Sequence, residues 1–483
     1  MANSKPKKAV PQAKHKTKSA SLQFDKRDRL ANRVPGRQTT ERARVPLVGQ
    51  VASQAKSTAK LLDDRIGFRL PILIAGILLA KGRCTVACWL RAAGVKGDWD
   101  RFYDLLQSIG KNTNVLMLPL LYHIMSRFAS VREQQIILAD DDTPTKRYGK
   151  HVEAANVHRN PTAGPADGEW LYGHNWVCLA LLLPHRLFGI TALPLVSKLY
   201  VRKQNIEQLK PKYGWKFRTK HQLALEMVLE VLRAFGTTAR KFVAFDGAYF
   251  AKELIQPLLR EGVTVATRLR RDAKLFDMPV MSKGKGRPRK YGKSRISLSK
   301  RAGQRGGWQT TIVNKRGVNT ELKYKTSTAT NAVVGGAIRI VLVEYNVKNW
   351  AAYICTDPSM TVESIMEIVF SRWAIEETFH DLKEVWGAGE QQVRNIWSNI
   401  GCWHLCSWIY TMVELSSWDE THDSIVDRSD RPWDNPNRRP SHRDRKRKIA
   451  QEMLQNKFLN PLLDDVESEK FRRYLDELLA LAA

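Results

Sequence analysis

The sequence predicts a mixed α/β protein, and three features of the chain predict it. Short apolar runs typical of buried strands stop at acidic residues, near residues 135–139 and 241–245. Between them, residues 219–235 place apolar side chains on one face of a helix. A basic segment rich in β-favouring residues follows. Strands separated by a helix in this order indicate a mixed sheet flanked by helices.

The composition limits the class of protein. Of 483 residues, 43% are hydrophobic and 26% are charged, which excludes a wholly disordered chain. The longest uncharged apolar stretch near the start, residues 70–80, is too short for a bilayer span, which needs about 20 residues. The first residues lack the apolar centre of a signal peptide. Six cysteines are too few for a disulfide scaffold. We therefore expect a cytoplasmic protein that does not enter a membrane.

The charge of the chain indicates its partner. Lys and Arg number 79 against 48 Asp and Glu, a net charge of +31. Such an excess favours a polyanion, most simply nucleic acid, bound either by an enzyme or by a basic protein without chemistry. Residues 1–60 contain many lysines and few apolar side chains. We expect them to form a largely disordered arm that either contacts phosphates or only aids solubility.

Changes of composition along the chain predict six segments. Apolar residues at spacings of three and four predict helices from residue 61 onward, and further apolar runs at 176–183 and 188–199 add two strands to the core. The predicted segments are a basic arm (1–60), a helical, DNA-binding domain (61–130), the first part of the α/β core (131–267), a basic β-rich insertion (268–350), the second part of the core (351–415), and a C-terminal linker with a helical segment (416–483).

Carboxylates follow two of the predicted strands. Asp140, Asp141 and Asp142 come directly after the first, and Asp246 comes directly after another. The ends of strands in α/β sheets are where ligands gather, and clustered carboxylates suit a hard cation such as Mg²⁺. Asp-Thr-Pro and Asp-Gly are also ordinary turn sequences. Taken one at a time, these aspartates favour the turn interpretation.

A third carboxylate belongs to a predicted helix over residues 361–386. At about 100° per residue, Arg372, Glu376 and Lys383 fall on one narrow stripe of that helix. The plain alternative is a surface salt bridge between Arg372 and Glu376, four residues apart. A carboxylate with a cation on each side nevertheless has the parts for metal-dependent cleavage of a phosphodiester.

These three segments together resemble a known family. Asp141-Asp142-Thr143, Asp246-Gly247-Ala248-Tyr249 and the helix with Arg372, Glu376 and Lys383 are similar to bacterial insertion-sequence transposases of the DDE class, in the subgroup with a Y-x2-R-x3-E-x6-K signature. The resemblance covers roughly residues 62–450. One position departs from it, because Val369 stands where the signature has tyrosine.

The resemblance implies a fold, an activity and a metal. It implies a ribonuclease-H-like core in which Asp141, Asp246 and Glu376 hold two Mg²⁺ ions, with Mn²⁺ able to substitute. Asp142 competes with Asp141 for the first position. The implied reaction is cleavage at the ends of a mobile element, followed by joining of the freed 3′-hydroxyl to target DNA. The implied partners are terminal inverted repeats, target DNA and a second copy of the chain, at the bacterial nucleoid. A nuclease without strand transfer and an inactive DNA-binding protein remain as alternatives.

Further residues are predicted to contact DNA. Besides Arg372 and Lys383, these are Lys146, Arg147, Arg287, Arg289 and Lys290. The last three lie in a Gly-Arg-Pro loop that either enters an A·T-rich minor groove or only touches phosphates. Trp308 in the insertion can stack on a flipped base, although a place in the core is the more common role of a tryptophan. Cysteines paired four residues apart, at 84 and 88 and at 402 and 406, are expected to be buried thiols rather than zinc ligands.

Overall fold

A computed structural model describes residues 44–459, except for 161–162, 164–167, 237, 281–287, 347–348, 427, 429–432 and 436–437, and it also describes Leu478. All of these residues belong to one compact unit. Most of the predicted arm lies outside the described residues. Its last part is ordered, because α1 (Gly49–Ala59) buries Val51 and Ala55 one helical turn apart, so the prediction of disorder up to residue 60 is wrong there.

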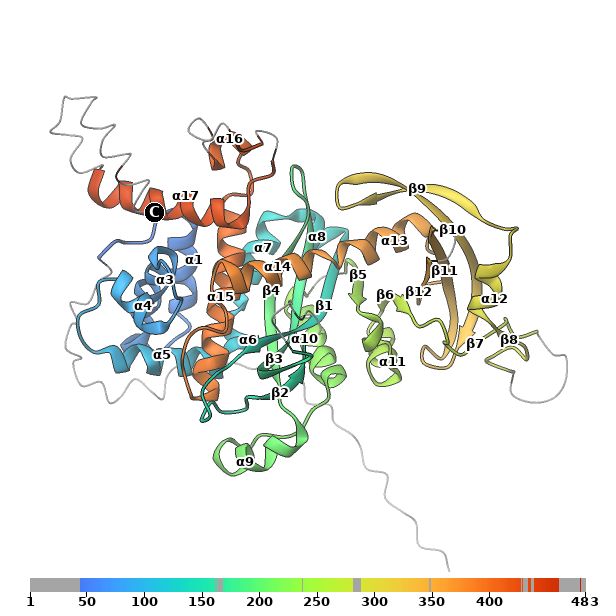
Figure 1. Cartoon of the computed structure of the whole chain (residues 1–483), viewed down its shortest axis with the longest axis horizontal. Coiled ribbons are helices and arrows are strands. Elements are labelled where there is room, and N and C mark those ends of the chain that lie inside the picture. Colours follow the sequence, from blue (N-terminus) through green and yellow to red (C-terminus); the bar gives the residue numbers. More distant parts are fainter. Residues whose placement is uncertain are drawn as a thin grey trace, which may run out of the picture. The chain divides into compact units, whose positions relative to one another are not determined.

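One twelve-stranded sheet organises the described part of the chain (Figure 1). Its main path runs β2-β3-β1-β5-β6-β12-β11-β10-β7-β8, with β4 paired to β3 and β9 paired to β10. The pairs β1–β5 and β5–β6 are parallel and the others are antiparallel. The strands are β1 (Gln135–Lys146), β2 (Asn156–Arg159), β3 (Trp170–His185), β4 (Gly189–Tyr200), β5 (Arg240–Phe245), β6 (Val263–Leu269), β7 (Leu275–Phe276), β8 (Arg295–Ile296), β9 (Gln309–Lys315), β10 (Val318–Asn331), β11 (Gly336–Asn346) and β12 (Asn349–Cys355). The predicted mixed α/β fold is confirmed.

Helices precede the sheet and flank it. The first group is α1, α2 (Asp64–Gly67), α3 (Arg69–Leu79), α4 (Val86–Ala92), α5 (Trp99–Lys111), α6 (Thr113–Leu116), α7 (Leu118–Arg127) and α8 (Ala129–Glu133). The others are α9 (Lys203–Tyr213), α10 (Lys220–Phe235), the short 3-10 helix η1 (Gly247–Tyr249), α11 (Lys252–Arg260), α12 (Leu298–Gly303), α13 (Val362–Ser371), α14 (Ala374–Glu384), α15 (Ile396–Ser416), α16 (His422–Ile425), α17 (His442–Leu454) and η2 (Gln455–Leu459). Helix α10 begins as predicted, because Thr219 and Gln222 form a capping box.

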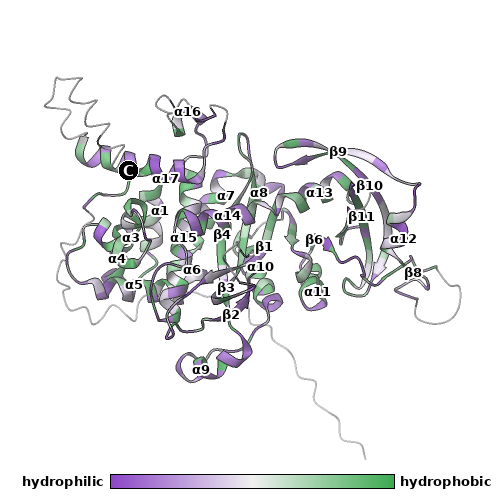
Figure 2. Ribbon diagram, viewed as in Figure 1, coloured by the Kyte–Doolittle hydropathy of each residue, from purple (hydrophilic) through white to green (hydrophobic). Residues whose placement is uncertain are grey.

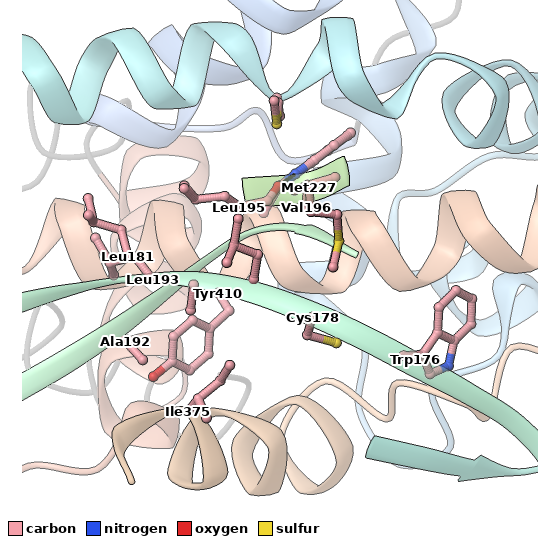
Figure 3. Packing of buried hydrophobic residues seen from close by; sticks show 14 of the residues in the cluster. Trp176, Cys178, Leu181, Ala192, Leu193, Leu195, Val196, Met227, Ile375 and Tyr410 are labelled. Carbon is pink, nitrogen blue, oxygen red and sulfur yellow. Dashed lines mark hydrogen bonds between the residues drawn. The ribbon is translucent and has the colours of Figure 1, made fainter. Parts of the chain in front are cut away.

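Helix α15 passes through the centre of the molecule; the sequence indicated only an apolar helical pattern around Cys402 and Cys406, not a helix of this length buried on all sides. Nearly all of its residues are buried, so it is apolar on every side rather than on one stripe. It crosses α5 very closely, because a side chain at Gly110 or Gly401 would overlap the backbone of the other helix. On its other side, Tyr410 packs with Ile375 of α14 and Ala192 of β4 (Figure 3). None of the described helices is long and apolar enough to cross a membrane.

The first strand extends beyond its predicted end. Asp140, Asp141 and Asp142 do not form a turn, because β1 continues through them to Lys146. Its antiparallel partner β3 stays paired as far as Lys146, whereas the parallel partner β5 is paired only up to Asp140. Beyond that residue β1 therefore has a neighbour on one side only, and a strand with a free edge accommodates Pro144. The acidic residues lie where the sheet opens.

Two other predictions are corrected. The helix predicted over residues 361–386 is interrupted at Arg372 and Trp373, which lie between α13 and α14. The polar stretch assigned to a linker is partly helical, since α17 begins at a Ser441–Asp444 capping box and is strongly hydrophilic along its exposed side (Figure 2). In addition, the strands of the insertion continue the core sheet through β12 and β11, an arrangement that the sequence does not reveal.

Candidate functional site

The site begins where the parallel pairing of three neighbouring strands ends. Asp140 of β1 pairs with Phe245 of β5, and Phe245 pairs with Thr267 of β6. The next residues along these parallel strands are Asp141, Asp246 and Arg268. Adjacent strands lie about 4.8 Å apart, so the register brings the two aspartates to the same edge as neighbours. The predicted proximity of the first two carboxylates is a direct result of this register.

Arg372 joins the third carboxylate to the first. Its guanidinium donates one hydrogen bond to Asp141 and a second, of 2.8 Å, to Glu376 Oε1. The Arg372 and Asp141 side chains are each only 16% exposed, and that of Glu376 is 35% exposed. Because ion pairs this sheltered are screened less than surface pairs, salt should weaken this bridge less than it weakens a surface pair.

Helix α14 is fixed so that Glu376 points toward this edge. Ile375 is fully buried beside the strands (Figure 3). The Thr378 hydroxyl donates to the carbonyl of Ala192 in β4 over 3.1 Å. Side chains three to four residues apart share a helix face, whereas Glu376 follows Ile375 by one residue, about 100° around the helix. The packing of the apolar face therefore determines where the glutamate lies.

Asp142 contacts a different set of residues. It accepts a 2.5 Å hydrogen bond from Lys220 Nζ of α10 and a 3.0 Å hydrogen bond from the Tyr249 hydroxyl. Successive side chains of a strand point to opposite faces of the sheet. Asp141 therefore faces Arg372 and α14, whereas Asp142 faces α10. The two candidates for the first position, which the sequence could not separate, lie on opposite faces.

The buried carboxylates of β1 have too few positive or hydrogen-bonding partners, and their pKa values are raised. The pKa of Asp141 is raised to about 7, chiefly by burial and also by the neighbouring charges of Asp142 and Asp246, while Arg372 opposes the rise. Burial also raises the pKa of Asp140 well above its usual value. Both carboxyl oxygens of Asp140 lack a hydrogen-bond partner among the described residues. This edge therefore contains more carboxylates than cations.

The pKa of Arg372 also reflects the excess of carboxylates over cations. Burial lowers its pKa, but the charges of Asp141, Glu376 and Asp246 outweigh burial and raise it above the ordinary value. All three predicted metal ligands therefore act on one guanidinium. Lys383, the second predicted cation, is half-buried, and burial lowers its pKa. It makes no hydrogen bond or ion pair with the described residues.

The donor set fits a hard divalent cation, although the three carboxylates face Arg372 rather than a shared metal position. Three carboxylates offer the oxygen ligands that Mg²⁺ prefers. Within the described ranges, no group of three or more Asp, Glu, His or Cys side chains lies close enough to hold a metal ion. Arg372 lies between two of the three carboxylates. Metal binding would therefore require this guanidinium to move.

Asp246 lies both at the end of a strand and at the start of a turn, the two positions that its sequence suggested. It lies at the end of β5 and also caps η1, accepting a 3.2 Å hydrogen bond from the Ala248 amide. The following turn is tight, because a Cβ on Gly247 would lie 2.9 Å from the carbonyl oxygen of Arg268. Glycine at this position lets the turn approach the end of β6.

The other predicted DNA contacts differ in their positions. Lys146 is exposed at the end of β1, and Arg289 and Lys290 are exposed in their loop. Arg287 lies outside the described residues. Arg147 is buried, where it donates to His174 Nδ1 over 3.2 Å and to the Gly389 carbonyl over 2.5 Å. Its guanidinium is an internal structural group, so the structure does not support a DNA contact for Arg147.

The predicted stacking residue lies among cations, and a second tryptophan, which the sequence suggested would pack on the sheet, is exposed instead. The Trp308 ring is half-buried, with the amines of Lys323 and Lys325 at 5.6 and 4.6 Å from its centroid. Trp373, which follows Arg372 directly, is 46% exposed. The guanidinium of Arg316, at the tip of the β9–β10 hairpin, lies 4.7 Å from its centroid. The sequence signal for it is its position directly after Arg372, beside the charged stripe of the signature segment.

Comparisons with known proteins identify a family for this chain. Residues 61–326 match a family described as "DDE superfamily endonuclease". No match was found among curated proteins. Among the solved structures that match is one described as "Cryo-EM structure of piggyBac transposase synaptic complex with hairpin DNA", at 10% sequence identity and a TM-score of 0.36. That match covers 88% of this chain and 76% of the other.

Proposed function

The chain belongs to the DDE superfamily of endonucleases, and we propose that it is the DNA transposase of a bacterial insertion sequence. In this proposal it cuts the ends of its element and joins the freed 3′-hydroxyls to target DNA. The observation that carries the proposal is the arrangement of Asp141, Asp246 and Glu376 around Arg372. This arrangement has more negative charge than the protein itself neutralises.

Each residue of the site has a proposed task. Asp141, Asp246 and Glu376 would hold the metal, with Asp141 preferred to Asp142 because it shares a face with Glu376. Bound there, two Mg²⁺ or Mn²⁺ ions would activate water or a DNA hydroxyl and stabilise the leaving oxygen. Arg372, released from the carboxylates, would pair with a DNA phosphate. Lys383, which has no partner among the described residues, would contact another.

The partners follow from the same proposal. The net charge of +31 suits double-stranded DNA, both as terminal inverted repeats and as target. Joining two element ends in one reaction calls for two active sites, so we propose a homodimer that assembles on DNA at the nucleoid. A ribonuclease-H-like nuclease without strand transfer is the alternative that the same carboxylates would support.

The test uses linear DNA that carries the coding region with its natural flanks, incubated with the full chain and Mg²⁺. We expect cuts at both flanks and, with added plasmid, joined products. Glu376→Gln should lower cutting by at least 10³-fold, because removing a ligand of the reacting ion removes its transition-state stabilisation. The affinity of Glu376→Gln for the same DNA should stay within a few-fold of the wild-type value.

Glu377→Gln is the matched control, since Glu377 is the neighbouring, more exposed glutamate, paired with Arg316 at 3.3 Å. It should cut like the wild type. Equal cutting by Glu376→Gln and the wild type would refute the assigned role. Cutting without joined products would favour the nuclease, and DNA binding without any cutting would favour an inactive binder.

A further inference from the structure

A pocket of about 370 Å³ opens beside Asp246, on the side away from Asp141. It lies at the end of β6, between the Asp246 turn and β12, and the strand order β1-β5-β6-β12 places it next in line after the two aspartates. Its walls include Arg268, Arg270 and Arg271, together with Asp246 and Asp272. A pocket of this size is within the range of sites that bind small molecules or single nucleotides.

The three arginines differ in what holds them. Arg271 is fixed, because it donates to the Trp350 carbonyl over 2.5 Å and its guanidinium lies 4.7 Å from the centroid of the Trp350 ring. Arg270 pairs with Asp272 at 3.1 Å, with both side chains largely exposed. Arg268 is exposed, and although its backbone pairs with Tyr353 of β12, its guanidinium forms no hydrogen bond or ion pair with the rest of the described chain. One cation of the pocket is thus free and another is held only by a surface pair, which is worth little.

We infer that this pocket binds a phosphate of the DNA strand next to the scissile phosphate, with Arg268 as its principal contact. The inference rests on the proposed function for the position of the cut, but the cations and the pocket are independent of it. Arg268 follows Thr267, which is in register with Phe245 directly before Asp246. A strand held at Asp246 would therefore place its next phosphate over Arg268.

The charge and shape of the pocket support this ligand. Three guanidiniums face two carboxylates, and Asp246 is itself a proposed metal ligand, so the pocket becomes more positive when a cation is bound. Guanidiniums pair well with phosphate oxygens. The position of the Asp246 turn relative to the pocket is fixed, because Gly247 packs directly on the backbone of Arg268. The pocket and the carboxylate thus form one rigid edge.

The test measures DNA binding by the full chain without metal, so that it does not depend on cutting. Affinity for a duplex is measured against salt for the wild type, Arg268→Ala and Arg233→Ala. Each phosphate contact contributes about 0.9 to the slope of log K against log salt. We expect Arg268→Ala to lower the slope by about one contact. Arg233 is also exposed and lies near the end of α10, which leads to the opposite end of β5, so Arg233→Ala should leave the slope unchanged.

A second measurement identifies the phosphate. Once the cut is located, the phosphate next to it is replaced by a neutral methylphosphonate. The wild type should then bind with the reduced slope of Arg268→Ala, and the variant should lose nothing further, because the two changes remove one interaction. Additive losses would overturn the inference. So would an unchanged slope for Arg268→Ala, or a slope change accompanied by a lowered melting temperature, since an exposed residue should not affect folding.

The two proposals fail in different ways. If the wild type does not cut DNA but Arg268→Ala lowers the slope, the proposed function fails and the pocket remains a phosphate site. If cutting is normal and the slope is unchanged, only the pocket inference fails. Loss of binding of a free deoxynucleoside monophosphate by Arg268→Ala, with no change in slope, would contradict a DNA strand as the ligand.

Discussion

Two buried groups of charged residues in this protein differ in one respect. At the edge of the sheet, Arg372 is bonded to Asp141 and Glu376, with Asp246 also within range. Between α15 and α17, Glu414 accepts hydrogen bonds from His442 at 2.6 Å and from Arg445 at 3.1 Å. The first group has several carboxylates for one cation, and the second has one carboxylate for two donors.

The different ratio of carboxylates to cations in the two groups appears in the pKa values of Asp141 and Glu414. Burial raises the pKa of Asp141 to about 7, and Arg372 does not compensate. Burial also raises the pKa of Glu414, but Arg445 and His442 outweigh it and hold the pKa at about 2. A buried carboxylate with sufficient partners belongs to the structure, whereas an excess of carboxylates indicates that a cation from outside is expected. Three predictions test this comparison.

The largest effect is expected at Glu414. Glu414→Gln leaves Arg445, which is 3% exposed, as a buried cation without its charge partner. Removing one member of a buried pair costs about 3–5 kcal/mol. We expect a loss of this size in the free energy of unfolding at pH 7, measured with denaturant. A change below about 1 kcal/mol would show that the second group is not structural.

The pH dependence of stability should differ in the same way. The folded pKa of Glu414 is depressed to about 2 from an ordinary 4.5. Its contribution is therefore present above pH 4.5 and is lost as pH falls toward 2, by about 3 kcal/mol. The wild type should lose that much more than Glu414→Gln over this range. Parallel pH profiles for the two proteins would contradict the assignment.

An effect of opposite sign is expected at Asp141. Its folded pKa is raised, so the protonated form is favoured in the folded state and stability falls as pH rises from about 4 to about 7. A rise of about three pKa units corresponds to about 4 kcal/mol, so Asp141→Asn, which removes this cost, should stabilise the protein by up to about that amount at pH 8. At pH 4 the two proteins should be equal. Destabilisation at pH 8 would show that the edge is balanced without metal.

Much of the site could be predicted from the sequence because its residues belong to short local patterns. Asp246 follows an apolar strand directly, and Arg372 and Glu376 are one helical turn apart. The choice between Asp141 and Asp142 could not be made, because it depends on which face of the sheet α14 covers. Burial of Arg147 depends on a contact with Gly389, which is far away in the sequence.

The rest of the fold was hidden for related reasons. Strands of the insertion join the core sheet through β12, and no local pattern shows which strands pair. Helix α15 is apolar all round, so it lacks the one-sided periodicity that identifies a surface helix. His442 and Arg445 lie in a stretch whose polar composition predicted a linker, although their partner Glu414 is buried in α15.

Metal binding by the full chain tests the central claim most directly. Mn²⁺ titrated into the wild type and followed by electron paramagnetic resonance reports bound metal without requiring DNA or cutting. We predict that Asp141→Asn, Asp246→Asn and Glu376→Gln each weaken binding at least tenfold, as removal of a ligand should, while Asp142→Asn, on the opposite face, binds like the wild type. Equal binding by all five proteins, or a loss confined to Asp142→Asn, would contradict the account.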